Sequence, residues 1–159
     1  MPRMQSLEDF FNRFMLSKRY PTSEEIMAKP VKFKRETIAA VKEWKTTFYN
    51  SYWKSYSNEA KLAHLYQLVT RLSQLYNKPL CIVHGNKYQY SPLTMTLTLD
   101  AENPSIISTL HEFSHHIQRD GGSEKQACRW SIWLFKKVFP KAFAKLQFIP
   151  NSHMLCKVQ

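Results

Sequence analysis

The sequence predicts an α+β fold, and three observations support this prediction. Apolar residues recur at helical spacing through most of the first half of the chain. Between residues 80 and 99 the pattern changes to short runs that are wholly apolar or alternate apolar with polar side chains. Two further helical segments follow, joined by a tight turn that contains Gly121 and Gly122. We therefore expect N-terminal helices, a small β-sheet and two antiparallel helices.

Four helices are predicted in the first half of the chain. Ser6 is a suitable cap for the first, and the second is expected to run from Thr22 to the break at Pro30. The third spans residues 36–49. The fourth and longest is expected to have its cap at Asn58. Its core-facing stripe has helical spacing and consists of Leu62, Leu65, Val69, Leu72 and Tyr76.

Three short strands are predicted to form the sheet. Residues 80–83 are all apolar, which is typical of a buried strand, and a turn is expected over residues 84–87. Residues 88–90 are then expected to pair back onto the first strand. Residues 93–99 alternate apolar side chains with threonine, so this strand should have one buried and one solvent-facing side.

Helices are predicted again after the sheet. Asn103 is a good cap for a helix over residues 104–119, which begins with a proline. Ser123 caps a second helix that ends near Val138, and Pro140 starts a final short one. The glycine turn between the two long helices should fold the second one back along the first.

The composition is that of one folded domain. The chain has 159 residues, of which 43% are hydrophobic, and this content argues against disorder. We expect residues 1–77 to pack on or cover the region 78–159 within one compact domain. No run resembles a membrane span or the apolar core of a signal peptide, and the three cysteines are odd in number. These features favour reduced thiols in a cytoplasmic protein.

The chain is strongly basic. Its formal net charge is +11 and its pI is about 9.7. Such a charge attracts nucleic acid and acidic protein surfaces. The basic residues are spread along the chain, and the densest run is residues 32–35. Weak association with nucleic acid and an ordinary basic surface both remain compatible with this pattern.

The five residues from His111 to His115 carry the clearest chemical signal. Two histidines four apart on a helix lie on the same side, so both imidazoles can reach one metal ion at roughly 2.0–2.1 Å. Glu112 projects about 100° around the helix from His111. It is therefore placed to accept a proton from metal-bound water and not to be a third ligand. This spacing predicts a zinc site with two ligands and a general base.

The remaining residues of this helix are compatible with a separate core face. Ile106, Leu110, Phe113 and Ile117 fall within about 60° of one another around the helix axis. The two ligand histidines point away from that stripe. His116 is expected to lie beside the site, near the substrate or in solvent, without binding the same ion.

A third zinc ligand is expected after the glycine turn. Glu124 stands in the first turn of the returning helix, and Ala127 would permit the close approach that brings it beside His115. Three other residues remain open as ligands, namely Asp120, Cys128 and His153. For Cys128 the preferred interpretation is a small residue packed in the core.

The motif resembles that of the zincin metallopeptidases, and the helix after it resembles the glutamate-ligand branch, the gluzincins. Within that branch the similarity is to ImmA/IrrE-type peptidases, although Cys128 stands where their pattern has asparagine. The residues that carry this likeness are Glu124, Ala127, Cys128, Trp130, Ser131, Leu134, Phe135 and Pro140. SprT-type peptidases are a weaker comparison, because they share the motif and often act near DNA but expect a histidine as third ligand.

The resemblance implies a zincin-like fold over about residues 80–140. It also implies that His111, His115 and Glu124 bind zinc, that Glu112 is the base, and that an extended peptide lies along an edge strand at residues 93–99.

We therefore expect zinc-dependent hydrolysis of peptide bonds in a protein or peptide substrate. Four residues are candidates to stabilise the oxyanion: Tyr88, Tyr90, His116 and His153. One alternative is a basic module that binds nucleic acid or protein and has a structural or vestigial zinc site. Another is a latent peptidase whose N-terminal helices cover the cleft.

Overall fold

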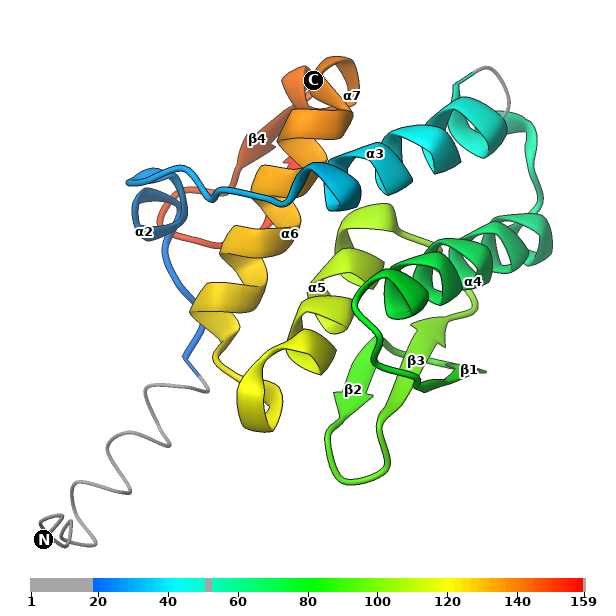
Figure 1. Cartoon of the computed structure of the whole chain (residues 1–159). Helices are drawn as coiled ribbons and strands as arrows, with labels where there is room; N and C mark the ends of the chain where they lie inside the picture. The colour runs from blue at the N-terminus through cyan, green and yellow to red at the C-terminus, as the bar shows by residue number, and fades with distance from the viewer. Residues whose placement is uncertain (1–18, 51–52, 159) are drawn as a thin grey trace, which may run out of the picture.

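The computed structural model describes residues 19–50 and 53–158, and it has the mixed α+β composition that the sequence predicts (Figure 1). The helix expected from Leu7 lies outside the described residues. The described α-helices are α2 (Ser23–Met27), α3 (Arg35–Trp44), α4 (Asn58–Leu75), α5 (Ile106–Ile117), α6 (Glu124–Val138) and α7 (Pro140–Ala144). Three short segments have other helical forms: η1 (Lys45–Tyr49), η2 (Trp53–Ser55) and η3 (Arg119–Gly121). The strands are β1 (Cys81–Gly85), β2 (Gln89–Ser91), β3 (Thr96–Asp100), β4 (Leu146–Phe148) and β5 (Leu155–Lys157).

The three-stranded sheet has the order β1-β3-β2, which corrects two expectations about strand pairing. Strand β3 pairs in parallel with β1 and antiparallel with β2, so residues 88–90 do not pair back onto the first strand. The segment 93–99 is also not the sheet edge that the family resemblance implies, because its ordered part is the central strand. The edges are β1 and β2, and β2 is the antiparallel one.

The central position of β3 follows from its side chains. Leu97 and Leu99 have no exposed surface, whereas Thr96 and Thr98 are only partly buried. The predicted alternation is therefore confirmed for this strand, although it begins later than expected and Leu93 is 96% exposed. Strand β1 lacks a buried residue, so the prediction of a buried strand at residues 80–83 is wrong. An edge strand with one neighbour has less of its surface covered than a central one.

Several helix ends differ from the predictions by one or two residues. Ser57, not Asn58, caps α4, and its hydroxyl accepts a hydrogen bond from the amide of Ala60. Ser105, not Asn103, caps α5, so the helix begins after Pro104. The third predicted helix ends as a π-helical turn, and α5 ends before an extended Gln118. The predicted cap at Ser123 and the start of α7 at Pro140 are confirmed, whereas the hairpin of β4 and β5 was not predicted.

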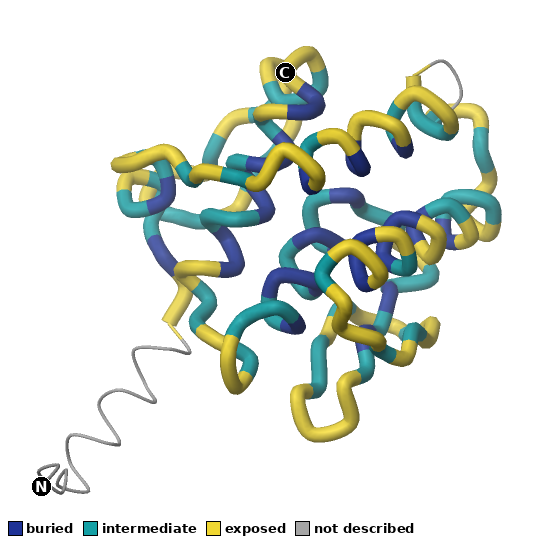
Figure 2. Tube along the Cα trace, in the orientation of Figure 1, coloured by how far each residue is buried: buried dark blue, intermediate teal, exposed yellow. Residues whose placement is uncertain are grey.

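One core joins the two halves of the chain. Helices α3 and α4 share it with α5, α6 and β3, and Figure 2 shows the buried segments on the facing sides of these elements. Its largest fully buried side chains include Val41, Leu65, Leu68, Leu72, Leu97, Leu99, Leu110, Phe113, Leu134 and Phe139. Helices α3 and α4 are therefore part of the scaffold and not a separable cover. None of the helices in the described ranges is long and apolar enough to span a bilayer.

Replacing Phe113 by alanine should lower the free energy of unfolding by about 3–5 kcal/mol, because this ring is fully buried on α5 against Tyr76 and Trp130. Urea denaturation of the metal-free protein measures the change. Leu93→Ala is the matched control at an exposed site and should cost less than about 0.5 kcal/mol. Equal losses for the two variants would contradict this description of the core.

Candidate metal centre

The site depends on a tight reversal of the chain between α5 and α6. Gly121 and Gly122 both have positive φ angles, of 82° and 65°, which side chains other than glycine rarely tolerate. A Cβ atom at Gly122 would also overlap the side chain of Gln118. Ser123 then caps α6 by accepting a hydrogen bond from the amide of Gln126. The reversal lays the first turn of α6 against the last two turns of α5.

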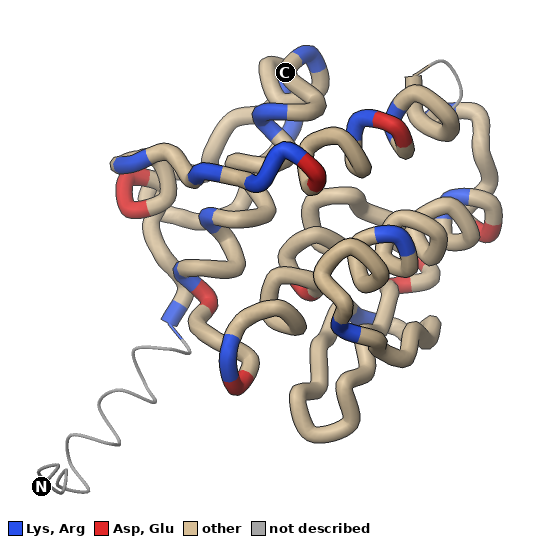
Figure 3. The backbone as a smooth tube through the Cα atoms, in the orientation of Figure 1, with Lys and Arg blue, Asp and Glu red and all other residues tan. Residues whose placement is uncertain are grey.

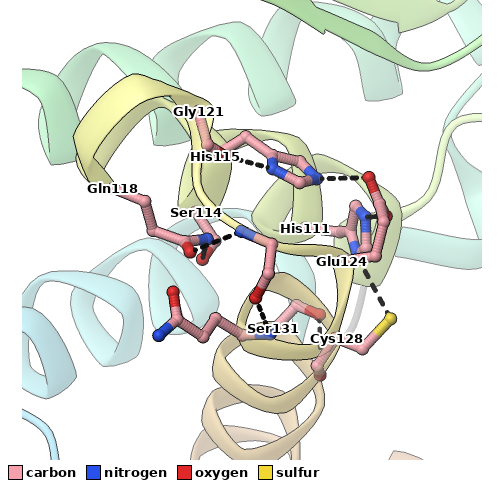
Figure 4. A network of polar contacts seen from close by, with 10 residues as sticks. His111, Ser114, His115, Gln118, Gly121, Glu124, Cys128 and Ser131 are labelled. Carbon is pink, nitrogen blue, oxygen red and sulfur yellow. Dashed lines mark hydrogen bonds and ion pairs between the residues drawn. The ribbon is translucent and has the colours of Figure 1, made fainter. Parts of the chain in front are cut away.

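This packing places Glu124 between the two histidines of the motif. One carboxylate oxygen, Oε2, lies 2.9 Å from Nε2 of His111, and the other, Oε1, lies 3.0 Å from Nε2 of His115 (Figure 4). The potential ligand atoms of these residues all lie within 4.8 Å of one another. No other set of three or more His, Cys, Asp or Glu side chains in the described ranges forms such a group. The three residues predicted as ligands therefore come together.

The hydrogen bonds behind the histidines orient them towards this point. Nδ1 of His115 lies 2.6 Å from the carbonyl oxygen of Gly121, which can only accept a hydrogen bond. Nδ1 therefore carries a proton, and in the neutral ring Nε2 presents a lone pair towards Glu124. A lone pair and a carboxylate oxygen 3.0 Å apart repel unless a cation lies with them. Such an outer hydrogen bond is the usual support for a metal-binding imidazole.

The pKa values of Glu124 and His115 are shifted in the directions that favour an ionised carboxylate beside a protonated histidine. Burial alone would raise the pKa of Glu124, but hydrogen bonds from His111 and His115 outweigh it and lower the pKa to about 2. Burial likewise opposes charge on His115, yet its bonds to Glu124 and Gly121 raise its pKa. In the metal-free protein a proton on the histidine supplies the positive charge, and a metal ion can replace it.

Glu112 has a different environment from Glu124. Burial raises the pKa of Glu112, although the charges of His111 and His115 oppose this change. Among the described residues none donates a hydrogen bond to its carboxylate or forms an ion pair with it. Its carboxylate is therefore free to accept a proton or a water, whereas both oxygens of Glu124 are engaged.

The structure places the rival ligands outside the cluster. The side chain of Asp120 is 94% exposed and lies 3.9 Å from Arg119. Cys128 is buried between Ile26 and Ile132, and its Sγ lies 3.7 Å from Nδ1 of His111. Burial raises the pKa of this thiol to about 12, so it stays protonated. Cys128 therefore packs behind His111, as the sequence interpretation preferred.

The candidates for oxyanion stabilisation divide into two groups. The hydroxyl of Tyr88 accepts a hydrogen bond from the amide of Ser105 at 2.6 Å and thereby holds the start of α5. Tyr90 contacts Nδ1 of the buried His116 at 2.7 Å, and the other nitrogen of that ring contacts the carbonyl oxygen of Lys78. These groups have structural partners.

His153 lies near the cluster with an aromatic neighbour that the sequence did not single out. Its ring stacks on Tyr20 with centroids 4.1 Å apart, and Tyr20 lies 6.5 Å from the ring of His111. Burial, followed by the charges of Glu124 and Glu112, raises the pKa of Tyr20. Tyr20 lies just before α2, where no periodicity marks a functional residue. Contact between the two ends of the described chain decides its place.

Comparison with protein-family models, curated proteins and solved structures finds no match for this chain.

The metal-free protein should be most stable between about pH 4.5 and 6.5 as far as this cluster is concerned. The stabilisation from His115, whose pKa is raised, is complete below its ordinary value of 6.5 and is lost as pH rises through the raised pKa. The contribution of Glu124 is present above its ordinary value of 4.5 and is lost as pH falls towards about 2. Thermal unfolding at several pH values measures both limits. Glu124→Gln should flatten the alkaline decline, and an unchanged decline in that variant would contradict the assignment.

Proposed function

We propose that this chain is a zinc-dependent metallopeptidase with a zincin-like catalytic region of the gluzincin type. The observation that supports the proposal most strongly is the difference between the two glutamates. Glu124 meets both histidines of the motif, whereas Glu112, one residue from His111, has no partner in the described structure. A purely structural metal site needs ligands but has no use for a second, unpaired carboxylate.

Zinc suits this donor set of two imidazole nitrogens and one carboxylate, which is typical of catalytic sites that keep a fourth position open. His111, His115 and Glu124 would hold the ion. Bound zinc supplies a Lewis acid that lowers the pKa of water to about 7 and polarises a carbonyl group. The short Nδ1 contact of His115 with Gly121 fixes the ring for this task.

Glu112 acts as the general base in this proposal. Its carboxylate takes the proton from the attacking water and delivers it to the departing amine. A raised pKa suits this role, because a carboxylate that binds protons more readily is a stronger base. The hydroxyl of Tyr20 and the ring of His153 are the neighbouring groups available to the substrate carbonyl. The free edge of β2, which packs beside α5, is the strand on which an extended peptide would lie.

Glu112→Gln should lower the rate of cleavage of an unstructured protein by about 10²- to 10⁴-fold and leave zinc binding intact, because the amide cannot accept the proton. Peptide-bond cleavage and zinc content are measured on the same preparation. Glu36→Gln removes an exposed carboxylate on α3 and serves as the control. Equal cleavage by wild-type protein and Glu112→Gln would contradict the mechanism.

Glu124→Ala should weaken zinc binding by at least about 10-fold, since it removes the ligand that joins α6 to the two histidines. Asp120→Ala removes the rival carboxylate of the turn and should leave the affinity unchanged. Competition with a chromophoric chelator gives both affinities. The opposite order would assign the third ligand to the turn and not to α6.

A second candidate function is a basic module that binds nucleic acid or protein, with zinc in a structural role. One observation favours it, namely that the net positive charge comes from residues 28–35 and 125–159, which pack against each other. Binding that persists without zinc, together with no cleavage by zinc-loaded protein, would favour this function. We propose a cytoplasmic location for either function, since all three cysteines are free thiols in the structure.

A further inference from the structure

The net positive charge comes from two stretches of the chain. Residues 28–35 and 125–159 together contain eleven of the 23 Lys and Arg residues and none of the 12 Asp and Glu residues. The other residues have twelve of each sign and are therefore electrically balanced. The whole surplus of +11 thus belongs to two segments that are about 90 residues apart in sequence. The interpretation that the basic residues are spread along the chain is therefore wrong, because the surplus is confined to these two segments.

Packing brings these two stretches side by side. The indole nitrogen of Trp133 on α6 donates a hydrogen bond to the carbonyl oxygen of Ile26, and Arg129 donates to the carbonyl oxygen of Lys29. The ring of Phe33 packs edge-on against Trp130, with centroids 5.9 Å apart. Figure 3 shows basic segments along the link before α3 and along α6 and α7. The structure therefore gathers the surplus charge on one side of the molecule.

A hollow of about 600 Å³ opens between the two stretches. Lys32, Lys136 and Lys137 line it, together with apolar side chains that include Phe33 and Trp133. No acidic residue is part of the lining. The hollow thus combines an apolar floor with positive charges, which is the composition expected for a ligand that has both a flat apolar part and negative charge.

The lysines of the hollow are available for a ligand. In the part of the chain that the structure describes, no carboxylate lies within ion-pair distance of Lys32, Lys136 or Lys137. Lys136 instead lies over the ring of Trp133, 4.9 Å from its centroid. Lys125, at the border of the basic side, does have an acidic partner in Glu25, at 3.7 Å. Unpaired charges at the hollow repel one another, and a bound polyanion would relieve that repulsion.

We propose that this basic hollow, between the link preceding α3 and the C-terminal half of α6, binds single-stranded nucleic acid. The lysines would contact consecutive phosphates, and an unpaired base would enter the hollow against Phe33 and Trp133. A duplex would present phosphates but keep its bases stacked inside, so it would leave the apolar floor unused. An acidic peptide would match the charge but not the flat aromatic lining. This binding does not depend on the metal centre.

Fluorescence anisotropy with labelled oligo(dT) and oligo(rU) of about 12 nucleotides tests the proposal on the full chain. Binding in the micromolar range is expected, with log affinity falling against log salt with a slope of about −2, as three phosphate contacts on a single strand require. A triple variant should weaken binding at least about tenfold and reduce the slope of log affinity against log salt. It combines Lys32→Glu, Lys136→Glu and Lys137→Glu.

Charge-matched substitutions outside both basic stretches supply the control. Lys42, Lys54 and Lys87 are exposed, and changing all three to Glu should weaken binding less than about threefold. Equal weakening by both triple variants would overturn the proposal, because attraction would then follow net charge alone. Equally tight binding of a duplex, of oligoglutamate or of vesicles rich in phosphatidylserine would also overturn it, as would no binding at low salt. Circular dichroism confirms that each variant is folded, and Glu112→Gln should bind as wild type does.

Discussion

The close antiparallel contact between α5 and α6 is the constraint on which the site depends. Two glycines with positive φ let the chain reverse within a few residues, and the reversal brings the carboxylate of Glu124 to both histidines of α5. The same turn supplies the carbonyl oxygen of Gly121 that orients His115. Bulky residues in the turn would separate the helices and displace both Glu124 and the carbonyl oxygen of Gly121.

The cluster shows how hydrogen bonds between partly buried side chains can outweigh burial and create a candidate cation site. In water, two imidazoles and a carboxylate associate only weakly, because each group is well solvated. Between α5 and α6, hydrogen bonds from the two histidines lower the pKa of the Glu124 carboxylate to about 2, although burial alone would raise it. Hydrogen bonds to Glu124 and Gly121 raise the pKa of His115, although burial opposes this change. The arrangement therefore favours a positive charge, either a proton or a metal ion, between these three side chains. Glu112, close by but unpaired, remains available for proton transfer.

The basic side of the molecule arises from a different part of α6. The first turn of this helix carries Glu124, whereas all its later charged residues are basic. One helix therefore presents the carboxylate of Glu124 to the candidate metal centre at its start and lysines to the hollow towards its end. Because the two sites lie at opposite ends of α6, a long anionic ligand could approach the hollow without contacting the candidate metal centre.

The sequence by itself determined the elements whose causes are local. The positions of α4, α6 and α7 follow from periodicity, caps and breakers within a few residues. The same holds for the alternation in β3 and for the placement of His111 and His115 on one side of α5. The position of Glu124 beside the two histidines could also be anticipated, because a Gly-Gly turn permits only a short path from α5 back to this residue. These features do not depend on contacts with remote segments.

Only the tertiary structure decided the features that require distant segments to meet. Strand β3 is central in the sheet, and its two buried leucines face the core. The local sequence pattern cannot predict which of the three strands takes the central position. Tyr20 reached the site through stacking with His153, more than 130 residues away in sequence. The basic hollow likewise exists only where residues 28–35 pack against α6. Periodicity indicates which face of a helix or strand is apolar. Only the packing of segments distant in sequence determines which other element that face contacts.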